Sequence, residues 1–336
     1  MFPEGSRLQG PIFIAGAPRS GTTLLRNLLN RHPQIGMCRE TGFFHYVYSR
    51  RREFGDLRDA GKRRRLVDEY LSIQRIQRMR VDMEALRARL LREGTSYQSL
   101  FTALLRFPAE AAGKALYGEK TPHTLFLETL WEWYPEAKVI HLLRDPRDVV
   151  ASLQRMPWAA NSVVTNARIW LSDNLRAWGY RAQPGYLLVR YEDLVAEPER
   201  ELRRVCGAIG VDYARCMMIP RLDPTADRPW FHRAEEPVTP GRSGAWREAL
   251  TAGDAALIEW VAGRHMDVLG YAASQPAARW PVIARGLGWA AWDSARRWIG
   301  EFPGGWLYVT KSKKLAAEEA AKDRFRFRHL TERLGS

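Results

Sequence analysis

A glycine-flanked segment near the N-terminus has the residue types of an anion-binding loop. Residues 16–23 read GAPRSGTT, and the spacing of the two glycines matches a phosphate-binding loop. Glycines let backbone N–H groups converge on an anion, while Thr22 and Thr23 add hydroxyl donors. A magnesium-dependent nucleoside triphosphatase has a lysine directly after the second glycine, but Thr22 stands there in this chain. The cation of the loop is Arg19 instead. The segment therefore predicts a phosphate or sulfate ligand, with a glycine-rich turn that binds nothing as the alternative.

Hydrophobic patterning places this loop between a strand and a helix. Residues 12–15 form a short β-branched run, and residues 23–30 repeat apolar side chains at helical spacing. A loop at a helix N-terminus faces the positive end of the helix dipole, which favours bound anions. Residues 34–38 predict a second strand, so the three elements form a βαβ unit with parallel strands.

Strands continue to alternate with helices along the chain. This order predicts an α/β fold, a P-loop-like parallel sheet flanked by helices on both faces, in a domain over residues 1–271. A helical insertion over about residues 46–106 interrupts the pattern, and its many arginines favour solvated helix faces. A Trp- and Arg-rich helical tail follows over residues 272–336. The other predicted elements are strands 116–119, 138–143 and 186–191, and helices 125–133, 198–209 and one that begins at Pro146.

The composition narrows the class of protein. The 336 residues carry 52 Lys and Arg against 38 Asp and Glu, a net charge of +14, and 46% are hydrophobic. Such a chain can bury a core and is expected to bind anions. Three cysteines without a CxxC pair favour a reducing compartment. Since no signal peptide or membrane-spanning run is evident, we expect a cytoplasmic location, with at most a peripheral contact to the inner face of a membrane.

Two motifs, in order, resemble the sulfotransferases that use 3′-phosphoadenosine 5′-phosphosulfate (PAPS). Residues 18–24, PRSGTTL, are similar to the family's loop for the 5′-phosphosulfate, and residues 143–152, LRDPRDVVAS, to its motif for the 3′-phosphate. The resemblance extends over roughly residues 11–271 and in motif is closest to bacterial, glycan and protein-tyrosine sulfotransferases. It implies that the nucleotide is held by Arg19, Ser20, Gly21, Thr22, Thr23, Arg144 and Ser152.

Two later segments match the same family. Residues 189–194, VRYEDL, resemble a strand-end segment, which implies that Tyr191 lies near the adenosine 3′,5′-bisphosphate. Residues 241–247, GRSGAWR, resemble the loop that closes over the nucleotide, with Arg242 and Ser243 as the implied contacts.

The resemblance also implies the catalytic residues. In the family, the segment similar to GEKTP holds a lysine, so Lys120, with Arg19, would stabilise charge on the transferring group. Glu40 follows the second predicted strand, where glycan and protein-tyrosine sulfotransferases carry their glutamate base. His123 is the second candidate base, because sulfotransferases of small molecules have a histidine close after the Lys-Thr pair. The structural alternative for Glu40 is an ion pair with Arg39 or Arg19.

Other titratable residues are expected to have structural roles. His141 lies inside an apolar strand, which is typical of a core histidine. For Arg147 and Asp148 we expect a local ion pair or helix-start charges. Glu119 is expected to be the partner of Lys120 or a solvated acid.

The implied activity is transfer of the sulfuryl group from PAPS to an acceptor hydroxyl of unknown class. We expect no metal, because arginine, lysine and backbone amides supply the positive field. The alternatives are a P-loop kinase-like phosphotransferase and a noncatalytic protein that binds anionic glycan or lipid on the same fold. No nucleic-acid-binding module is evident. The insertion is expected to build the acceptor pocket, with Phe43, Phe44 and Tyr46 as either an apolar wall or core residues.

The tail repeats tryptophan and arginine at helical spacing, as in Trp289, Trp292, Arg296 and Arg297. This pattern is compatible with an interfacial helix on anionic lipid. A helix that packs on the core or on a second subunit is the alternative, so a membrane contact and a subunit contact both remain open.

Overall fold

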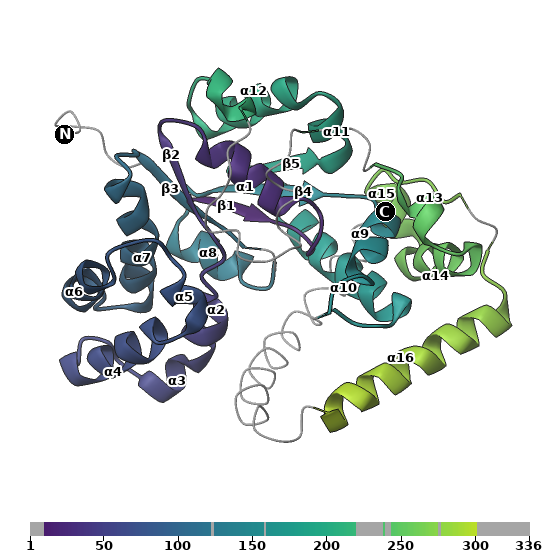
Figure 1. Cartoon of the computed structure of the whole chain (residues 1–336), viewed down its shortest axis with the longest axis horizontal. Coiled ribbons are helices and arrows are strands. Elements are labelled where there is room, and N and C mark those ends of the chain that lie inside the picture. Colours follow the sequence, from purple (N-terminus) through teal and green to yellow (C-terminus); the bar gives the residue numbers. More distant parts are fainter. Residues whose placement is uncertain are drawn as a thin grey trace.

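The computed structural model describes residues 10–121, 124–157, 159–219, 238, 243–274 and 277–300. Within these residues the chain forms a five-stranded parallel sheet of order β2-β3-β1-β4-β5 (Figure 1). The predicted α/β fold with a parallel sheet is therefore confirmed. The strands are β1 (Ile12–Ala15), β2 (Ile35–Cys38), β3 (Leu116–Lys120), β4 (Lys138–Leu143) and β5 (Tyr186–Arg190).

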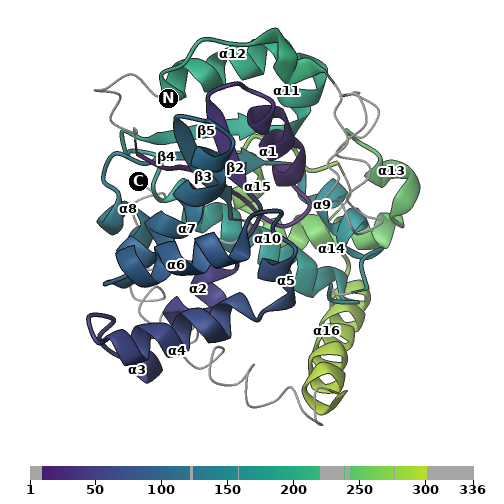
Figure 2. The same cartoon turned by 60° about the vertical axis from the view of Figure 1, so that its left-hand side comes forward.

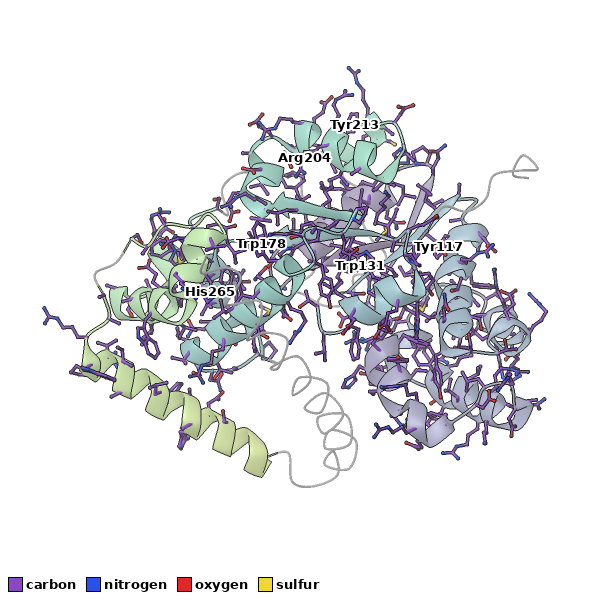
Figure 3. All side chains as sticks on the ribbon, turned by 180° about the vertical axis from the view of Figure 1, so that it is seen from behind. Tyr117, Trp131, Trp178, Arg204, Tyr213 and His265 are labelled. Atoms are coloured by element: carbon purple, nitrogen blue, oxygen red, sulfur yellow. The ribbon has the colours of Figure 1, made fainter. Side chains whose placement is uncertain are left out.

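Side chains of the central strands alternate between two hydrophobic layers, because successive residues of a strand point to opposite faces. Phe13 and Val139 pack with the helices that follow β2, whereas Ile14 and Ile140 pack with α1 (Thr22–Asn30) and α12 (Pro198–Ile209). In Figure 3, Tyr213 and Arg204 lie with α12, and Tyr117 and Trp131 lie with the other layer. Helices thus cover both faces of the sheet, as predicted.

The predicted insertion lies between β2 and β3 and is helical from Phe43 to Ala111, a few residues longer at each end than expected. Phe43 and Phe44 are buried core residues, and the Phe43 ring stacks on Phe101 at 4.7 Å between centroids. The core alternative therefore holds for these two aromatics. The helices are α2 (Phe43–Tyr46), η1 (Tyr48–Arg50), α3 (Arg51–Phe54), α4 (Ala60–Leu71), α5 (Gln74–Gln77), α6 (Met83–Glu93) and α7 (Tyr97–Ala111).

The second half of the domain adds helices around β4 and β5. His141 of β4 is a core histidine, as predicted: its Nδ1 lies 2.6 Å from the Tyr186 hydroxyl and its Nε2 lies 2.9 Å from Asn174 Oδ1. Burial lowers its pKa to about 4, so it is neutral. The helices are α8 (Leu127–Trp133), α9 (Pro146–Leu153), α10 (Val163–Trp178), α11 (Tyr191–Ala196), η2 (Arg215–Met218), α13 (Trp246–Ala249), α14 (Ala252–Ala262) and α15 (Arg264–Val268).

The described part of the tail is helix α16 (Trp280–Gly300), which lies at the outside of the molecule against α10 and α14 (Figure 2). Ile283 and Ala290 are buried in this contact, whereas Trp289 and Trp292 are about half exposed and stack on each other. None of the helices in the described ranges is long and apolar enough to cross a membrane. Residues 301–336 of the predicted tail lie outside the described residues.

Candidate active site

The glycine-flanked loop has the backbone that its sequence requires. Gly16, Arg19 and Gly21 have positive φ angles of 151°, 70° and 96°, in a region that favours glycine. A Cβ on Gly16 would lie 2.4 Å from the Leu142 carbonyl oxygen, and a Cβ on Gly21 would lie 2.5 Å from the Tyr191 ring. The loop is therefore wedged between β4 and α11, and glycine is needed at both of its corners.

This loop presents hydrogen-bond donors at the start of α1. The helix begins at Thr22, and the first N–H groups of a helix have no partner within it. Ser20 is fully buried, and its hydroxyl has no hydrogen-bond partner among the residues that the structure describes. A buried hydroxyl beside a helix N-terminus fits an anion such as a phosphosulfate.

The predicted residues of the 3′-phosphate motif lie beside the loop. Arg144, directly after β4, donates from Nη1 to the Arg19 carbonyl oxygen at 3.2 Å, and its guanidinium lies 4.1 Å from the centre of the Tyr191 ring. Ser152 of α9 accepts from Arg19 Nε at 3.0 Å. The structure thus brings Arg19, expected at the 5′-phosphosulfate, next to Arg144 and Ser152, expected at the 3′-phosphate. Tyr191, expected near the adenosine 3′,5′-bisphosphate, lies in the same group.

Asp148 holds the later segment of the chain against α9. Its carboxylate accepts from the backbone N–H groups of Gly244 and Trp246, both at 2.9 Å, and lies 3.8 Å from Arg144. Ser243 adjoins this contact, whereas Arg242 lies outside the described residues. Burial raises the pKa of Asp148. The sequence suggests a helix-start charge or an ion pair for Asp148. No local pattern indicates that its carboxylate holds the segment at Gly244 and Trp246 against α9.

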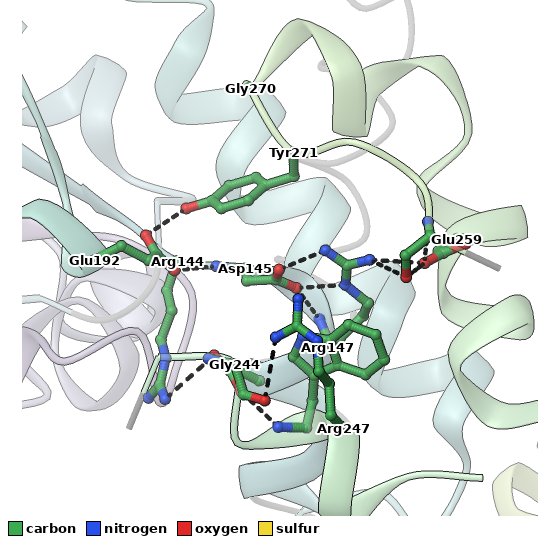
Figure 4. Close-up of polar contacts among 12 residues, drawn as sticks. Arg144, Asp145, Arg147, Glu192, Gly244, Arg247, Glu259, Gly270 and Tyr271 are labelled. Carbon is green, nitrogen blue, oxygen red and sulfur yellow. Dashed lines mark hydrogen bonds and ion pairs between the residues drawn. The ribbon is translucent and has the colours of Figure 1, made fainter. Parts of the chain in front are cut away.

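Arg147 forms the ion pair that the sequence suggested, although with other partners. Its guanidinium pairs with Asp145 at 2.7 Å and with Glu259 of α14 at 2.8 Å (Figure 4). It also lies over the Trp246 ring. One guanidinium thus contacts two buried carboxylates and links α9 to α14, so Arg147 has a structural role at this junction.

The acceptor side of the site is built around Glu40. Its Oε2 lies 3.4 Å from Lys120 Nζ, and its Oε1 lies 3.0 Å from Arg75 Nη1. Lys120 is 8% exposed, and burial lowers the pKa of its ammonium group. Arg75 belongs to α5 of the insertion, and sequence reasoning missed it among the many arginines of that segment. The pair of Glu40 and Lys120 therefore combines a partly exposed carboxylate with a buried cation.

Glu119 is not the solvated acid that was one expectation. It is 2% exposed, and its Oε1 accepts from the Thr41 backbone N–H while its Oε2 accepts from the Thr121 hydroxyl at 3.2 Å. Burial raises its pKa to about 7. Its position in β3 opposite Cys38 of β2 explains the burial.

The two sides of the site meet at one edge of the sheet. Ile14 pairs with Lys120 in the register of β1 and β3, so the loop after β1 and the lysine that ends β3 emerge together. Glu40 follows β2, and Arg144 follows β4, at the same carboxyl edge. His123 lies outside the described residues, so the choice between Glu40 and His123 as the base stays a prediction.

Metal ligands are not grouped in this region. Among the residues for which the structure gives positions, no three His, Cys, Asp or Glu side chains lie together so as to hold a metal ion. The arrangement combines anion donors with a carboxylate next to a cation, which suits transfer of an anionic group to a hydroxyl.

Comparisons with known proteins agree with this arrangement. A model described as the sulfotransferase family matches residues 11–215. The chain is 31% identical to nodulation protein NoeE of Sinorhizobium fredii, over 60% of this chain and 50% of that one. It is 27% identical to protein-tyrosine sulfotransferase 2 of Gallus gallus, over 60% and 52%. The chain thus spans about half the length of these two relatives.

Solved structures share the fold. The sulfotransferase domain of the Synechococcus PCC 7002 olefin synthase is 23% identical, with a TM-score of 0.52 over 78% of this chain and 98% of that chain. The sulfotransferase domain from the curacin biosynthetic pathway is 20% identical, with a TM-score of 0.53 over 80% and 100%. At such identities the likeness concerns the fold alone.

Proposed function

Because the chain belongs to the sulfotransferase family, we propose that it moves the sulfuryl group of PAPS to an acceptor hydroxyl, giving a sulfate ester and adenosine 3′,5′-bisphosphate. The observation that carries this proposal is the meeting of the anion-binding loop with the Glu40–Lys120 pair at one edge of the sheet. A donor site and a proton acceptor are both needed for the transfer, and this edge holds candidates for each.

The donor side would bind the nucleotide by its two anionic ends. The loop amides, the Ser20 hydroxyl and Arg19 would hold the 5′-phosphosulfate, and Arg144 with Ser152 would hold the 3′-phosphate. Tyr191 lies under the Arg144 guanidinium and would keep it oriented. When bound, PAPS supplies the sulfuryl group and a stable leaving phosphate.

The acceptor side would activate the hydroxyl. Glu40 would accept the hydroxyl proton at a carboxylate oxygen, and Lys120, 3.4 Å from that carboxylate, would stabilise negative charge on the leaving phosphate. The protein forms no bond to the transferred group in this scheme, so catalysis comes from positioning and electrostatics. The acceptor itself is proposed only as a hydroxyl compound.

Two other functions make different predictions. A kinase-like phosphotransferase would need magnesium and a lysine in the loop, and Thr22 stands in that position. A noncatalytic binder of anionic glycan or lipid would not consume PAPS. The cytoplasmic location and a contact of the tail with a membrane or a second subunit stay predictions; the exposed tryptophans of α16 favour a contact.

The test uses purified full-length protein with 35S-labelled PAPS and a panel of acceptors: 4-nitrophenol, a tyrosine-containing peptide, an oligosaccharide and a metabolite extract. We expect label to appear in an acceptor without added magnesium, and calorimetry to show binding of adenosine 3′,5′-bisphosphate. ATP turnover that depends on magnesium would support the kinase alternative. Binding of the nucleotide without transfer to any acceptor would support the noncatalytic one.

A further inference from the structure

Thr41, the residue directly after Glu40, takes part in three separate hydrogen bonds. The Thr41 N–H donates to the Glu119 carboxylate, the Thr41 carbonyl accepts from the Tyr70 hydroxyl at 3.2 Å, and the Thr41 hydroxyl accepts from the Phe43 N–H at 3.2 Å. Thr41 is 2% exposed. A surface turn does not need such anchoring, so the turn that presents Glu40 is kept in one conformation.

The same carboxylate also holds the segment after Lys120. Glu119 Oε2 accepts from the Thr121 hydroxyl at 3.2 Å, and the Thr121 N–H donates to the Ile14 carbonyl oxygen at 2.8 Å. Glu119 is therefore bonded to the residue after Glu40 and to the residue after Lys120. It joins the ends of β2 and β3 at the place where the acid–base pair is formed.

We propose that Glu119 is a positioning residue for sulfuryl transfer: its buried carboxylate bonds to the backbone after Glu40 and to the hydroxyl after Lys120, and so keeps these two side chains in register. This inference rests on the proposed function. Glu119 acts here through Thr41 and Thr121, and it is assigned no contact with either substrate.

Ionisation of Glu119 should control this positioning. The titratable groups that interact electrostatically with it are Glu40 and Cys38 of the β2 end, Tyr70 of α4, Arg75 of α5 and Tyr134. Lys120 is its neighbour in β3, and Arg26 of α1 acts on Cys38 and Lys120. Both of its oxygens accept hydrogen bonds. Protonation would turn one oxygen into a donor, so the Thr121 hydroxyl would have to rotate and accept instead of donating. Because burial raises its pKa to about 7, we expect turnover to fall as the pH falls through that value.

Two substitutions separate the parts of this proposal. Glu119→Ala removes both acceptors, so we expect kcat to fall at least about tenfold, with the KM for PAPS nearly unchanged. Glu119→Gln keeps an acceptor for the Thr41 N–H and cannot ionise. As the neutral isostere of the protonated acid, it should show at every pH the lower kcat that the wild type reaches below neutral pH, and its profile should lack the ionisation near pH 7.

The experiment measures kcat, KM for PAPS and melting temperature from about pH 5 to about pH 9, with an acceptor that the wild type sulfates. The matched control is Glu201→Ala, which removes another buried carboxylate, one that pairs with Arg204 on α12. This control should keep the wild-type kcat and pH profile even where its melting temperature falls. If Glu119→Ala does not fold, the pH profile of Glu119→Gln decides the question.

Wild-type kcat in Glu119→Ala, or an unchanged ionisation near pH 7 in Glu119→Gln, would overturn the positioning role and leave the proposed function standing. A wild-type protein that binds adenosine 3′,5′-bisphosphate but sulfates no acceptor would instead refute the proposed function, and the positioning role with it.

Discussion

The donor side and the acceptor side of the site are built in different ways. On the donor side, Gly16, Arg19, Ser20 and Gly21 belong to one short segment, and its shape depends on backbone angles. On the acceptor side, Glu40 follows β2, Arg75 belongs to α5 and Lys120 ends β3, and these three elements are far apart in sequence. The loop of the donor side is a local structure next to a helix terminus, which Arg144 and Ser152 join from elsewhere in the chain. The acceptor side has no such local part and exists only in the folded chain.

This difference indicates which substitutions should impair nucleotide binding and which should impair turnover. A backbone loop binds through N–H groups that no side-chain substitution removes, so it is damaged mainly by changes in conformation. A cluster of charged side chains depends on each member, because removing one partner leaves the others buried without compensation. Changes on the donor side should therefore act on nucleotide affinity, and changes on the acceptor side on turnover.

The largest effect is expected for Glu40→Gln. Loss of the proton acceptor should lower kcat by about 1,000-fold, because general-base catalysis contributes on this scale. Affinity for adenosine 3′,5′-bisphosphate should stay within about twofold of the wild-type value. Steady-state kinetics and calorimetry measure the two quantities. Glu93→Gln is the control, because Glu93 also contacts two arginines, Arg89 and Arg92, on α6. A Glu40→Gln variant with wild-type turnover would move the base to His123.

The pH dependence of stability tests the acceptor side without any reaction. The folded-state pKa of Glu119, about 7, lies above its ordinary value of 4.5, so the folded protein keeps a proton that the unfolded chain releases. The free energy of unfolding of the wild type should therefore fall relative to Glu119→Gln as the pH rises between these values. The limit is about 3 kcal/mol, and the difference should then stay constant.

Urea unfolding of both proteins at a series of pH values gives this difference directly. Subtracting the Glu119→Gln curve removes the contributions of the other titrating groups to first order. A difference that is flat across the range would mean that Glu119 is not desolvated in the folded protein, contrary to its 2% exposure.

On the donor side, Gly21→Ala should disturb the loop. The alanine would have to adopt a φ of 96°, and its Cβ would lie 2.5 Å from the Tyr191 ring. We therefore expect the free energy of unfolding to fall by about 2 kcal/mol and nucleotide binding to weaken. Chemical denaturation and calorimetry measure these. Gly207→Ala in α12 is the control, since nothing lies within 4 Å of its Cβ, and it should stabilise the protein slightly. Unchanged nucleotide affinity in Gly21→Ala would remove the loop from the donor site.

The smallest effect is expected for Arg144→Lys. Lysine keeps the charge but loses the planar guanidinium that lies 4.1 Å from the Tyr191 ring centre, so affinity for adenosine 3′,5′-bisphosphate should fall about tenfold. The kcat at saturating PAPS should hardly change. Arg203→Lys is the matched control, because the Arg203 guanidinium on α12 also lies over a tyrosine ring, that of Tyr213, at 4.4 Å from the ring centre. A drop in kcat without a change in affinity would contradict the division between the two sides.

Sequence patterns were sufficient wherever the signal is local. The strand Lys138–Leu143 and the helix Pro198–Ile209 have the predicted bounds. A run of apolar residues marks the strand, and a proline marks the start of the helix, and both signals act on neighbouring residues. Tyr191 was predicted as the last residue of a strand but begins α11, a difference of one residue at an element boundary.

Long-range contacts were not predictable in this way. Arg75 reaches Glu40 from an insertion with many similar arginines, and nothing in the sequence distinguishes it. Asp148 holds Gly244 and Trp246 almost a hundred residues later in the chain. The sequence suggests Glu119 either as the partner of Lys120 or as a solvated acid, yet it is buried, and Lys120 pairs with Glu40. Side chains of adjacent residues in a strand point to opposite faces.

The sequence by itself therefore determined the strand–loop–helix unit, its glycine corners and the order of the nucleotide-binding motifs, because backbone angles and hydrophobic periodicity are properties of short segments. Only the tertiary structure decided which charges meet. The register of β2 on β3 buries Glu119 between Thr41 and Thr121, and the packing of α5 brings Arg75 to Glu40. Ion pairs and buried hydrogen bonds depend on distances across the fold, which residue spacing along the chain does not encode.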